Sequence, residues 1–463
     1  MLTPTRIRAM RPLRFAAALL SVIAVSSCSD LTVPDYNNAS IEDLSTNPTP
    51  DKIAAAAQGL LFGTRVMIGP QNGYVSLLGI LGRESYNFDA ADPRFITEML
   101  IGPLDGGSPA FGGNLFPQPF RNIQNAHIML DALDRTPGMT DEQKEAVRGF
   151  AKTIQALDFL LAINTRDDLG LPIDVDRDPR DDPAPIVSKS EVFAHIVQLL
   201  DEGQAHLAAG GAAFHFSLSP GFSNFATPQS FITLNRGLKA RVDAYMGNYD
   251  EALEALSESF IDSTASLDLG AYHTYTTGSG DVQNLLFDPA GRAILAHPSI
   301  LTDAQQQPGG AVDARALRKV AQLDDARTVQ NITSDLIFTI YSSNIAPIPV
   351  IRNEELILLR AEARIFTSDL AGAVRDINLI RATSGGLAPY AGPVTQQALL
   401  DELLYNRRYS LLFEGGHRWI DARRFGRLAQ LPLAVSTHTV QSRFPFTESE
   451  CLARVPAPTA GCT

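Results

Sequence analysis

The densest group of residues capable of acid–base chemistry lies between residues 405 and 426. Five arginines share this segment with Glu414, Asp421 and Trp419. Paired carboxylates can act as a general acid and a general base. An arginine beside a carboxylate, however, favours the ionised form and lowers the pKa, which removes the proton that a general acid must give. The segment therefore predicts an ion-pair cluster that stabilises the fold, not a catalytic centre.

Other catalytic and metal-binding patterns are missing from the sequence. It contains no His-Glu-x-x-His, Gly-x-Ser-x-Gly or Gly-x-x-x-x-Gly-Lys motif. His195 and His206 share one predicted helix but lie roughly 16 Å apart, too far for one metal ion. Residues 174–178 begin like a calcium loop, but Pro179 replaces the glycine that the sharp turn requires. We expect no cofactor and no metal, with a looser calcium site in residues 167–182 left open.

The amino-terminal segment has the pattern of an export signal. Four arginines precede a short apolar stretch, residues 15–25, which is too short to span a bilayer as a helix. Small residues then lead directly to Cys28, as in a bacterial lipobox. We therefore predict that residues 1–27 are a removed signal peptide, that Cys28 is lipidated, and that residues 28–50 form a polar tether. Several acyl chains on one residue give a lasting membrane anchor.

The overall charge excludes one class of partner. The formal net charge is −13, and loss of the four arginines in residues 1–27 leaves −17. No basic cluster remains that could follow a nucleic-acid backbone, so we expect no nucleic-acid partner. An acidic chain instead fits a protein held at the membrane by its lipid.

Helical periodicity dominates residues 51–463, which we expect to form a single domain. The predicted helices cover residues 51–62, 121–133, 140–163, 190–209, 233–246, 249–260, 353–366, 369–382 and 397–413. Several of them form pairs around short turns, and the turn at Gly247-Asn248 resembles the second half of a tetratricopeptide repeat. These patterns predict an all-α fold of tetratricopeptide-like helical pairs. Long irregular insertions, residues 63–119, 210–231 and 267–349, would lie on one face and carry a binding surface.

Aromatic and polar residues in these insertions have the chemistry that a sugar ligand needs. Sugar rings stack on aromatic faces, and their hydroxyls bond to arginine, amide and carboxylate groups. The segment around Tyr86, Phe88 and Arg94 offers both kinds of group in a predicted loop, and Tyr272 and Tyr275 offer a second set. These five residues are our candidate ligand contacts, with local packing as the alternative for each.

The carboxyl-terminal motifs resemble the SusD/RagB family of outer-membrane lipoproteins. Members carry an arginine pair, an aromatic-Glu-Gly, an Arg-Trp and an Asp-x-x-Arg-aromatic-Gly, which match Arg407-Arg408, Phe413-Glu414-Gly415, Arg418-Trp419 and Asp421 to Gly426 here. Further matches lie at residues 120–126, 188–193, 348–363 and 377–381. The resemblance implies an outward-facing lipoprotein of the cell outer membrane. It also implies a partner, a SusC-like TonB-dependent transporter, and a nutrient ligand that is an oligosaccharide or a peptide.

Two alternatives to a nutrient-binding protein remain open. A glycoside hydrolase would need a carboxylate pair hidden in the insertions, and a purely structural scaffold would have no ligand cavity. Besides Cys28, the chain has only Cys451 and Cys462, which have ten residues between them in an exported tail. Because disulfides persist outside the cytoplasm, we expect these two to bond and to pin the carboxyl-terminal tail.

Overall fold

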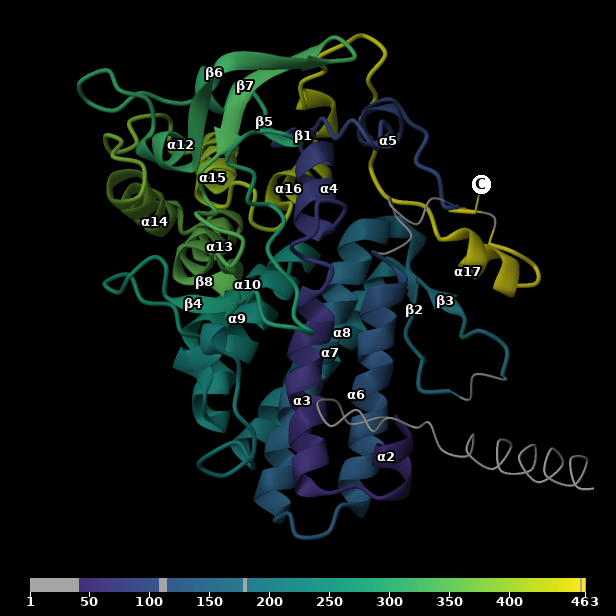
Figure 1. Ribbon diagram of the computed structural model, residues 1–463. Helices are drawn as coiled ribbons and strands as arrows, with labels where there is room; N and C mark the ends of the chain where they lie inside the picture. The colour runs from purple at the N-terminus through teal and green to yellow at the C-terminus, as the bar shows by residue number, and fades with distance from the viewer. Residues whose placement is uncertain (1–40, 108–114, 178–180, 459, 463) are drawn as a thin grey trace, which may run out of the picture.

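Helices form most of the molecule, and the computed structural model describes residues 41–107, 115–177, 181–458 and 460–462. Successive helices pack against one another (Figure 1). This arrangement confirms the predicted all-α class. The long helices are α3 (Pro50–Arg65), α6 (Pro117–Arg135), α7 (Asp141–Arg166), α8 (Lys189–Ala208), α9 (Pro228–Met246), α10 (Tyr249–Ser257), α13 (Asn353–Phe366), α14 (Leu370–Thr383) and α15 (Gln396–Ser410).

Local sequence explains where several of these helices begin and end. Thr140 and Ser188 cap α7 and α8, and each forms a capping box with the residue three positions later. At the other end of α9, Gly247 adopts a left-handed conformation with φ of 83°, which a residue with a Cβ atom rarely adopts. This turn reverses the chain into α10, as the resemblance to a tetratricopeptide repeat predicts.

The insertions are more ordered than the irregular loops expected from sequence. They contain short helices and strands: α4 (Tyr74–Leu81), α5 (Arg94–Ile96), α11 (Ser299–Thr302), α12 (Ala314–Lys319), β1 (Ser85–Asn87), β4 (Gly270–His273), β5 (Ile294–Ala296), β6 (Val320–Val329), β7 (Ile332–Phe338) and β8 (Ile348–Arg352). In the pairing of β1 with β5, Tyr86 lies opposite Leu295. The first and third insertions are therefore joined by backbone hydrogen bonds.

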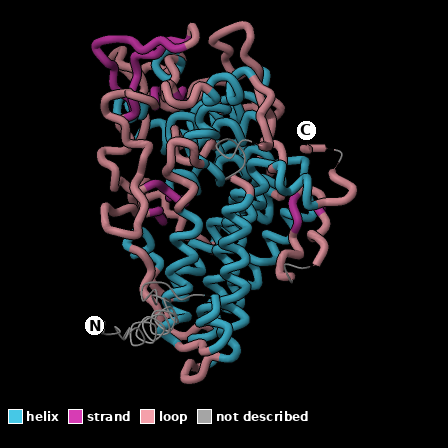
Figure 2. The backbone as a smooth tube through the Cα atoms, turned by 45° about the vertical axis from the view of Figure 1, so that its right-hand side comes forward, coloured by secondary structure: helices cyan, strands magenta, loops and turns pink. Residues whose placement is uncertain are grey.

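Strands of the first and third insertions gather at one end of the molecule, whereas the second insertion, residues 210–231, packs along the helical bundle, where Gln58 of α3 donates to the Ser217 carbonyl at 3.2 Å. Figure 1 shows β1, β5, β6 and β7 above the bundle of α3, α6 and α7, and Figure 2 shows the same separation after a 45° turn. One large hydrophobic core runs through both parts, and a smaller core lies between α13, α14 and α15. A rigid helical frame therefore supports the insertion end.

The arginine-rich segment forms a buried ion-pair cluster, as predicted. Its second helix, α16 (His417–Arg424), brings Asp421 to 3.0 Å from Arg407 Nε. Arg407 and Arg424 both bind Glu362 of α13. Glu414 departs from the expectation, because it pairs with Arg352 at the end of β8 instead of with an arginine of its own segment.

Both ends of the described chain are tied to the body. Helix α2 (Ile41–Thr46) occupies part of the predicted tether, and its Leu44 is buried, so packing begins before residue 51. At the other end, Cys451 of α17 (Glu448–Ala453) forms a disulfide with Cys462. Cys28 and residues 1–27 lie outside the described residues.

Candidate functional site

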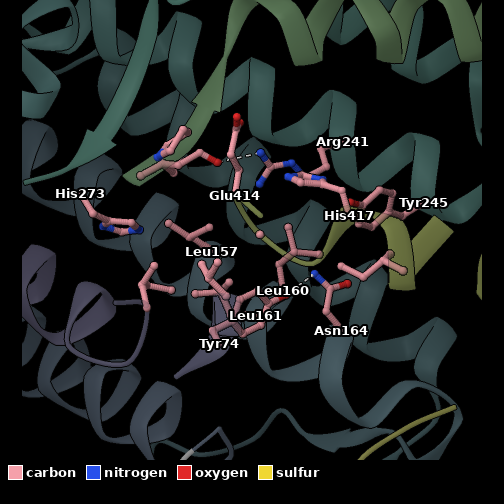
Figure 3. Close-up of a pocket in the computed structure, with 16 residues that line it drawn as sticks. Tyr74, Leu157, Leu160, Leu161, Asn164, Arg241, Tyr245, His273, Glu414 and His417 are labelled. Carbon is pink, nitrogen blue, oxygen red and sulfur yellow. Dashed lines mark hydrogen bonds between the residues drawn. The ribbon is translucent and has the colours of Figure 1, made fainter. Parts of the chain in front are cut away.

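One cavity, between the helices and the strands β4 and β8, is too small to hold a nutrient. Its volume is about 40 Å³, which leaves room for a few water molecules at most. Asn164 donates to the hydroxyl of Tyr74 at 3.2 Å, and Arg241 donates to the carbonyl of Val350 at 2.7 Å (Figure 3). Burial lowers the pKa of His417 to about 4, so this ring is neutral near pH 7. The polar groups around this cavity therefore bond to one another inside the protein, and we do not take the cavity as a ligand site.

A much larger cleft, of about 710 Å³, opens beside the paired strands β4 and β8. We call it the β4–β8 cleft. The segment before β4, the β7–β8 connection and the end of α14 also contribute to its walls. Aromatic, apolar, hydroxyl and charged side chains all line it, which is the mixture expected of a small-molecule site.

The floor of the β4–β8 cleft is a buried quartet of charges, namely Lys319, Arg352, Glu354 and Glu414. Glu414 accepts from Lys319 Nζ at 2.8 Å and from Arg352 Nε at 2.9 Å. Arg352 also binds Glu354, whose other oxygen accepts from the Ser410 hydroxyl at 2.5 Å. The two cations and two carboxylates of the quartet therefore neutralise one another.

The electrostatic environment keeps both floor carboxylates ionised. Burial alone would raise the pKa of Glu354, but the charges of Arg352 and Lys319 outweigh it and hold this pKa at about 2. Burial opposes ionisation of Glu414 in the same way, and the same two cations lower its pKa below the usual value. Neither group carries a proton near pH 7 that it could donate to a leaving group.

Tyr272 supplies an aromatic ring to the wall of this cleft. A bulge between Ala271 and Tyr272 interrupts the pairing of β4 with β8, and such irregularities re-aim a side chain. Behind the strand, Gly221 approaches so closely that an added Cβ would lie 2.0 Å from the Tyr272 carbonyl oxygen. The Tyr272 hydroxyl donates to the Asp268 carbonyl at 2.5 Å, so backbone contacts and this hydrogen bond fix the half-buried ring.

The rim of the cleft is formed by polar side chains that reach solvent, namely Ser266, Asp268, Arg318 and Thr383. The Asp268 side chain is 85% exposed. Arg318 Nη1 donates to the Ser384 carbonyl at 2.9 Å, which directs the guanidinium to the end of α14. The rim therefore offers a carboxylate and hydroxyls close to the Tyr272 ring.

The structure places only one of the five candidate ligand residues in the β4–β8 cleft, and that residue is Tyr272. Tyr86 is 2% exposed, and its ring stacks on Phe88 with centroids 5.6 Å apart. Tyr275 is also buried. Arg94 is partly exposed and is held by Asp92 at 2.8 Å. The expectation of a stacking platform at residues 86–88 is therefore corrected, because the pairing of β1 with β5 folds these rings into the core.

A second cleft of about 710 Å³ lies beside the disulfide-bonded tail, but its lining is less suited to a polar ligand. Proline and apolar side chains dominate it, with Asp182 and Arg454 as the charged members. Arg454 is occupied by Glu450 at 2.5 Å and by the Ala184 carbonyl at 2.6 Å. We therefore take the β4–β8 cleft as the candidate site.

The sequence reasoning missed most of this site. In the sequence, Arg352 and Glu354 stand out only as part of the family pattern at residues 348–363, and Glu414 only as part of the arginine-rich segment. Nothing in the sequence near Asp268 or Lys319 indicates that they meet, because they lie far apart within the same insertion, residues 267–349. A search for charged residues at the ends of β-rich segments could have found Arg352.

Metal binding has no support within the part of the chain that the structure describes, where no group of three potential ligand side chains occurs. Asp167 pairs with Lys189 at 2.5 Å and with Arg423 at 3.2 Å, and Asp168 binds Arg443. A calcium ion using either carboxylate would have to displace these cations. Among the described helices, none is long and apolar enough to cross a membrane.

Comparisons with known proteins agree with the resemblance seen in the sequence. The SusD family matches residues 334–448. A SusD superfamily protein from Bacteroides vulgatus has a similar structure, with 15% identity, a TM-score of 0.64, and coverage of 84% of this chain and 91% of that one. No curated protein matches this sequence.

Two further similar structures are described by the ligand that their proteins bind. A SusD-like carbohydrate binding protein from Bacteroides fragilis has 14% identity and a TM-score of 0.65, with 82% of this chain and 87% of that one covered. A laminarin binding SusD-like protein has 16% identity and a TM-score of 0.56, with 82% and 92% covered. At these identities the likeness shows a shared fold.

Proposed function

Because this chain belongs to the SusD family, we propose that it is a non-catalytic surface lipoprotein that captures an oligosaccharide. It would then deliver the oligosaccharide to a SusC-like TonB-dependent transporter. The observation that carries the proposal is the β4–β8 cleft, where the Tyr272 ring lies beside convergent polar groups in about 710 Å³. A volume of this size fits a short oligosaccharide. The carbohydrate-binding descriptions of two structural relatives support the same ligand class.

The state of the carboxylates supports binding without catalysis. A glycoside hydrolase needs one carboxylic acid with a raised pKa to protonate the leaving group. In the β4–β8 cleft, Glu354 and Glu414 are both held ionised by Arg352 and Lys319. Capture of a peptide remains the alternative, since the cleft also has apolar walls, including Ile340 and Pro349.

The cellular setting that we propose rests on the amino-terminal sequence. Residues 1–27 would be removed as a signal peptide, and acyl chains on Cys28 would anchor the protein to the outer membrane, facing outward. Residues 51–463 would act as one nutrient-binding domain. The Cys451–Cys462 disulfide would keep the tail attached to this domain outside the cell.

Calorimetry with a panel of oligosaccharides and peptides tests this function. The wild-type protein should bind at least one oligosaccharide saturably and release no product. Tyr272→Ala should weaken that binding by about 1–3 kcal/mol if the ring stacks as aromatic rings do on nucleic-acid bases. Tyr272→Phe is the matched control, because it keeps the ring and removes only the hydroxyl that donates to Asp268.

Each contrary result points to a different conclusion. Shortened glycan products would show a hydrolase, and binding of peptides alone would show the alternative ligand. If Tyr272→Ala bound the oligosaccharide as tightly as the wild type, the β4–β8 cleft would not be the binding site.

A further inference from the structure

We infer that the β4–β8 cleft selects an uncharged oligosaccharide and discriminates against glycans that carry carboxylate or sulfate groups. This inference rests on the proposed function and narrows the ligand class. It follows from the charges that line the cleft and from how each of them is already occupied.

The ionisable side chains of the cleft balance in number. Three are acidic and three are basic: Asp268, Glu354, Glu414, Arg318, Lys319 and Arg352. A site built for an anionic glycan would be expected to show an excess of arginine or lysine, because these side chains bind carboxylate and sulfate groups through charge-assisted hydrogen bonds. No such excess is present among the lining residues that the structure describes.

The basic side chains of the floor are also committed to partners within the protein. Lys319 Nζ contacts Glu414 at 2.8 Å and the Ser410 carbonyl at 2.5 Å. Arg352 uses its guanidinium for Glu354, Glu414 and the same carbonyl. A ligand anion could gain these cations only by separating buried ion pairs, which is strongly unfavourable.

The charged groups of the rim act in the same direction. Arg318 donates to the Ser384 carbonyl and lies 3.4 Å from the Ser384 hydroxyl, so part of its donor capacity is used. Asp268 is the rim carboxylate. Its Oδ1 lies 3.9 Å from Arg352 Nη1, but its side chain is 85% exposed, so it would repel an anion and accept hydrogen bonds from sugar hydroxyls. The formal net charge of −13 adds a long-range field that also disfavours polyanions.

Matched glycans that differ only in charge test the inference. We would titrate the full-length lipidation-deficient variant Cys28→Ser with laminarin, xylan, galactan and mannan oligosaccharides. Each neutral oligosaccharide would be paired with its carboxymethylated derivative at low and at physiological salt. The neutral form should bind, and its carboxymethylated partner should bind at least ten-fold more weakly, with the difference shrinking as salt is added.

Two variants test whether the preference for uncharged over charged glycans comes from the cleft. Asp268→Asn should improve binding of the carboxymethylated form about three-fold at low salt, the effect of one charge at roughly 7 Å in water. Glu254→Gln removes the same charge from the exposed surface of α10, outside the cleft, and should change neither form. Because both side chains are exposed, neither substitution disturbs the core.

The outcomes separate this inference from the function beneath it. Tighter binding of a carboxymethylated form, or of alginate or polygalacturonate over every neutral glycan, would overturn the inference and leave glycan capture standing. Equal effects of Asp268→Asn and Glu254→Gln would also overturn it, because the selectivity would then come from the net charge alone. Failure to bind any glycan would overturn the proposed function.

Discussion

Removing Glu414 should destabilise the protein because this side chain holds two buried cations together. It accepts hydrogen bonds from Lys319 at 2.8 Å and from Arg352 at 2.9 and 3.1 Å. Glu414→Ala would leave the floor of the β4–β8 cleft with one uncompensated positive charge. Breaking a buried ion pair on one side costs about 3–5 kcal/mol, and we expect a loss of this size in the free energy of unfolding.

Scanning calorimetry measures this loss as a fall in Tm on the order of 5 °C. Asp401→Ala is the control, because Asp401 pairs with Arg427 at 2.5 Å but is 54% exposed. An exposed pair contributes about 0–1 kcal/mol, so this variant should melt close to the wild type. If Glu414→Ala melted as Asp401→Ala does, the reasoning about buried charge at the cleft floor would be wrong.

Three further predictions concern other parts of the chain. Tyr86→Ala should lower the free energy of unfolding by about 3–5 kcal/mol in calorimetry, because the ring is buried, and should leave glycan affinity unchanged. Weaker glycan binding at unchanged Tm would instead show that Tyr86 contacts the ligand. Burial raises the pKa of Glu84 to about 7. Ionisation of this carboxyl group therefore lowers the free energy of unfolding as pH rises from about 5 to 8. Glu84→Gln should therefore gain on the order of 2–3 kcal/mol over the wild type at pH 8 and little at pH 5; a gain independent of pH would exclude this cause. Cys28→Ser should move the exported protein from the membrane fraction to the aqueous fraction, and unchanged partitioning would refute lipidation there.

The helical frame could be predicted because its signals are local. The apolar spacing and caps of α7 and α8 lie within a few residues of the positions that they determine. The predicted helix at residues 353–366 has the same bounds as α13. Strands β1, β4, β5 and β8 carry no such signal, since a strand of three to five residues in a Gly- and Pro-rich insertion shows no clear periodicity.

The ligand residues were harder to predict because burial depends on distant parts of the chain. Tyr86 stands in a segment with the composition of a binding loop, yet its pairing partner Leu295 comes from another insertion. Without that contact, a core ring and a ligand platform look alike in sequence. Tyr272 differs because its strand carries a bulge beside an open cleft, which no spacing of residues reveals.

The family match divides the β4–β8 cleft into two parts. Residues 334–448 include three members of the floor quartet, Arg352, Glu354 and Glu414. The aromatic wall and most of the rim lie outside this match, including Tyr272, Asp268 and Arg318. Because the floor charges neutralise one another and stabilise the fold, they can persist while the ligand changes.

This division gives separate expectations for the two parts of the cleft. Substitutions in the floor should lower Tm, because they expose buried charge, whatever glycan is present. Substitutions of exposed rim residues such as Asp268 should change ligand preference at nearly constant Tm, because these side chains are already in contact with water. The matched region therefore supplies most of the charged floor of the candidate site, while Tyr272, Asp268 and Arg318 lie in the part of the third insertion that precedes the match.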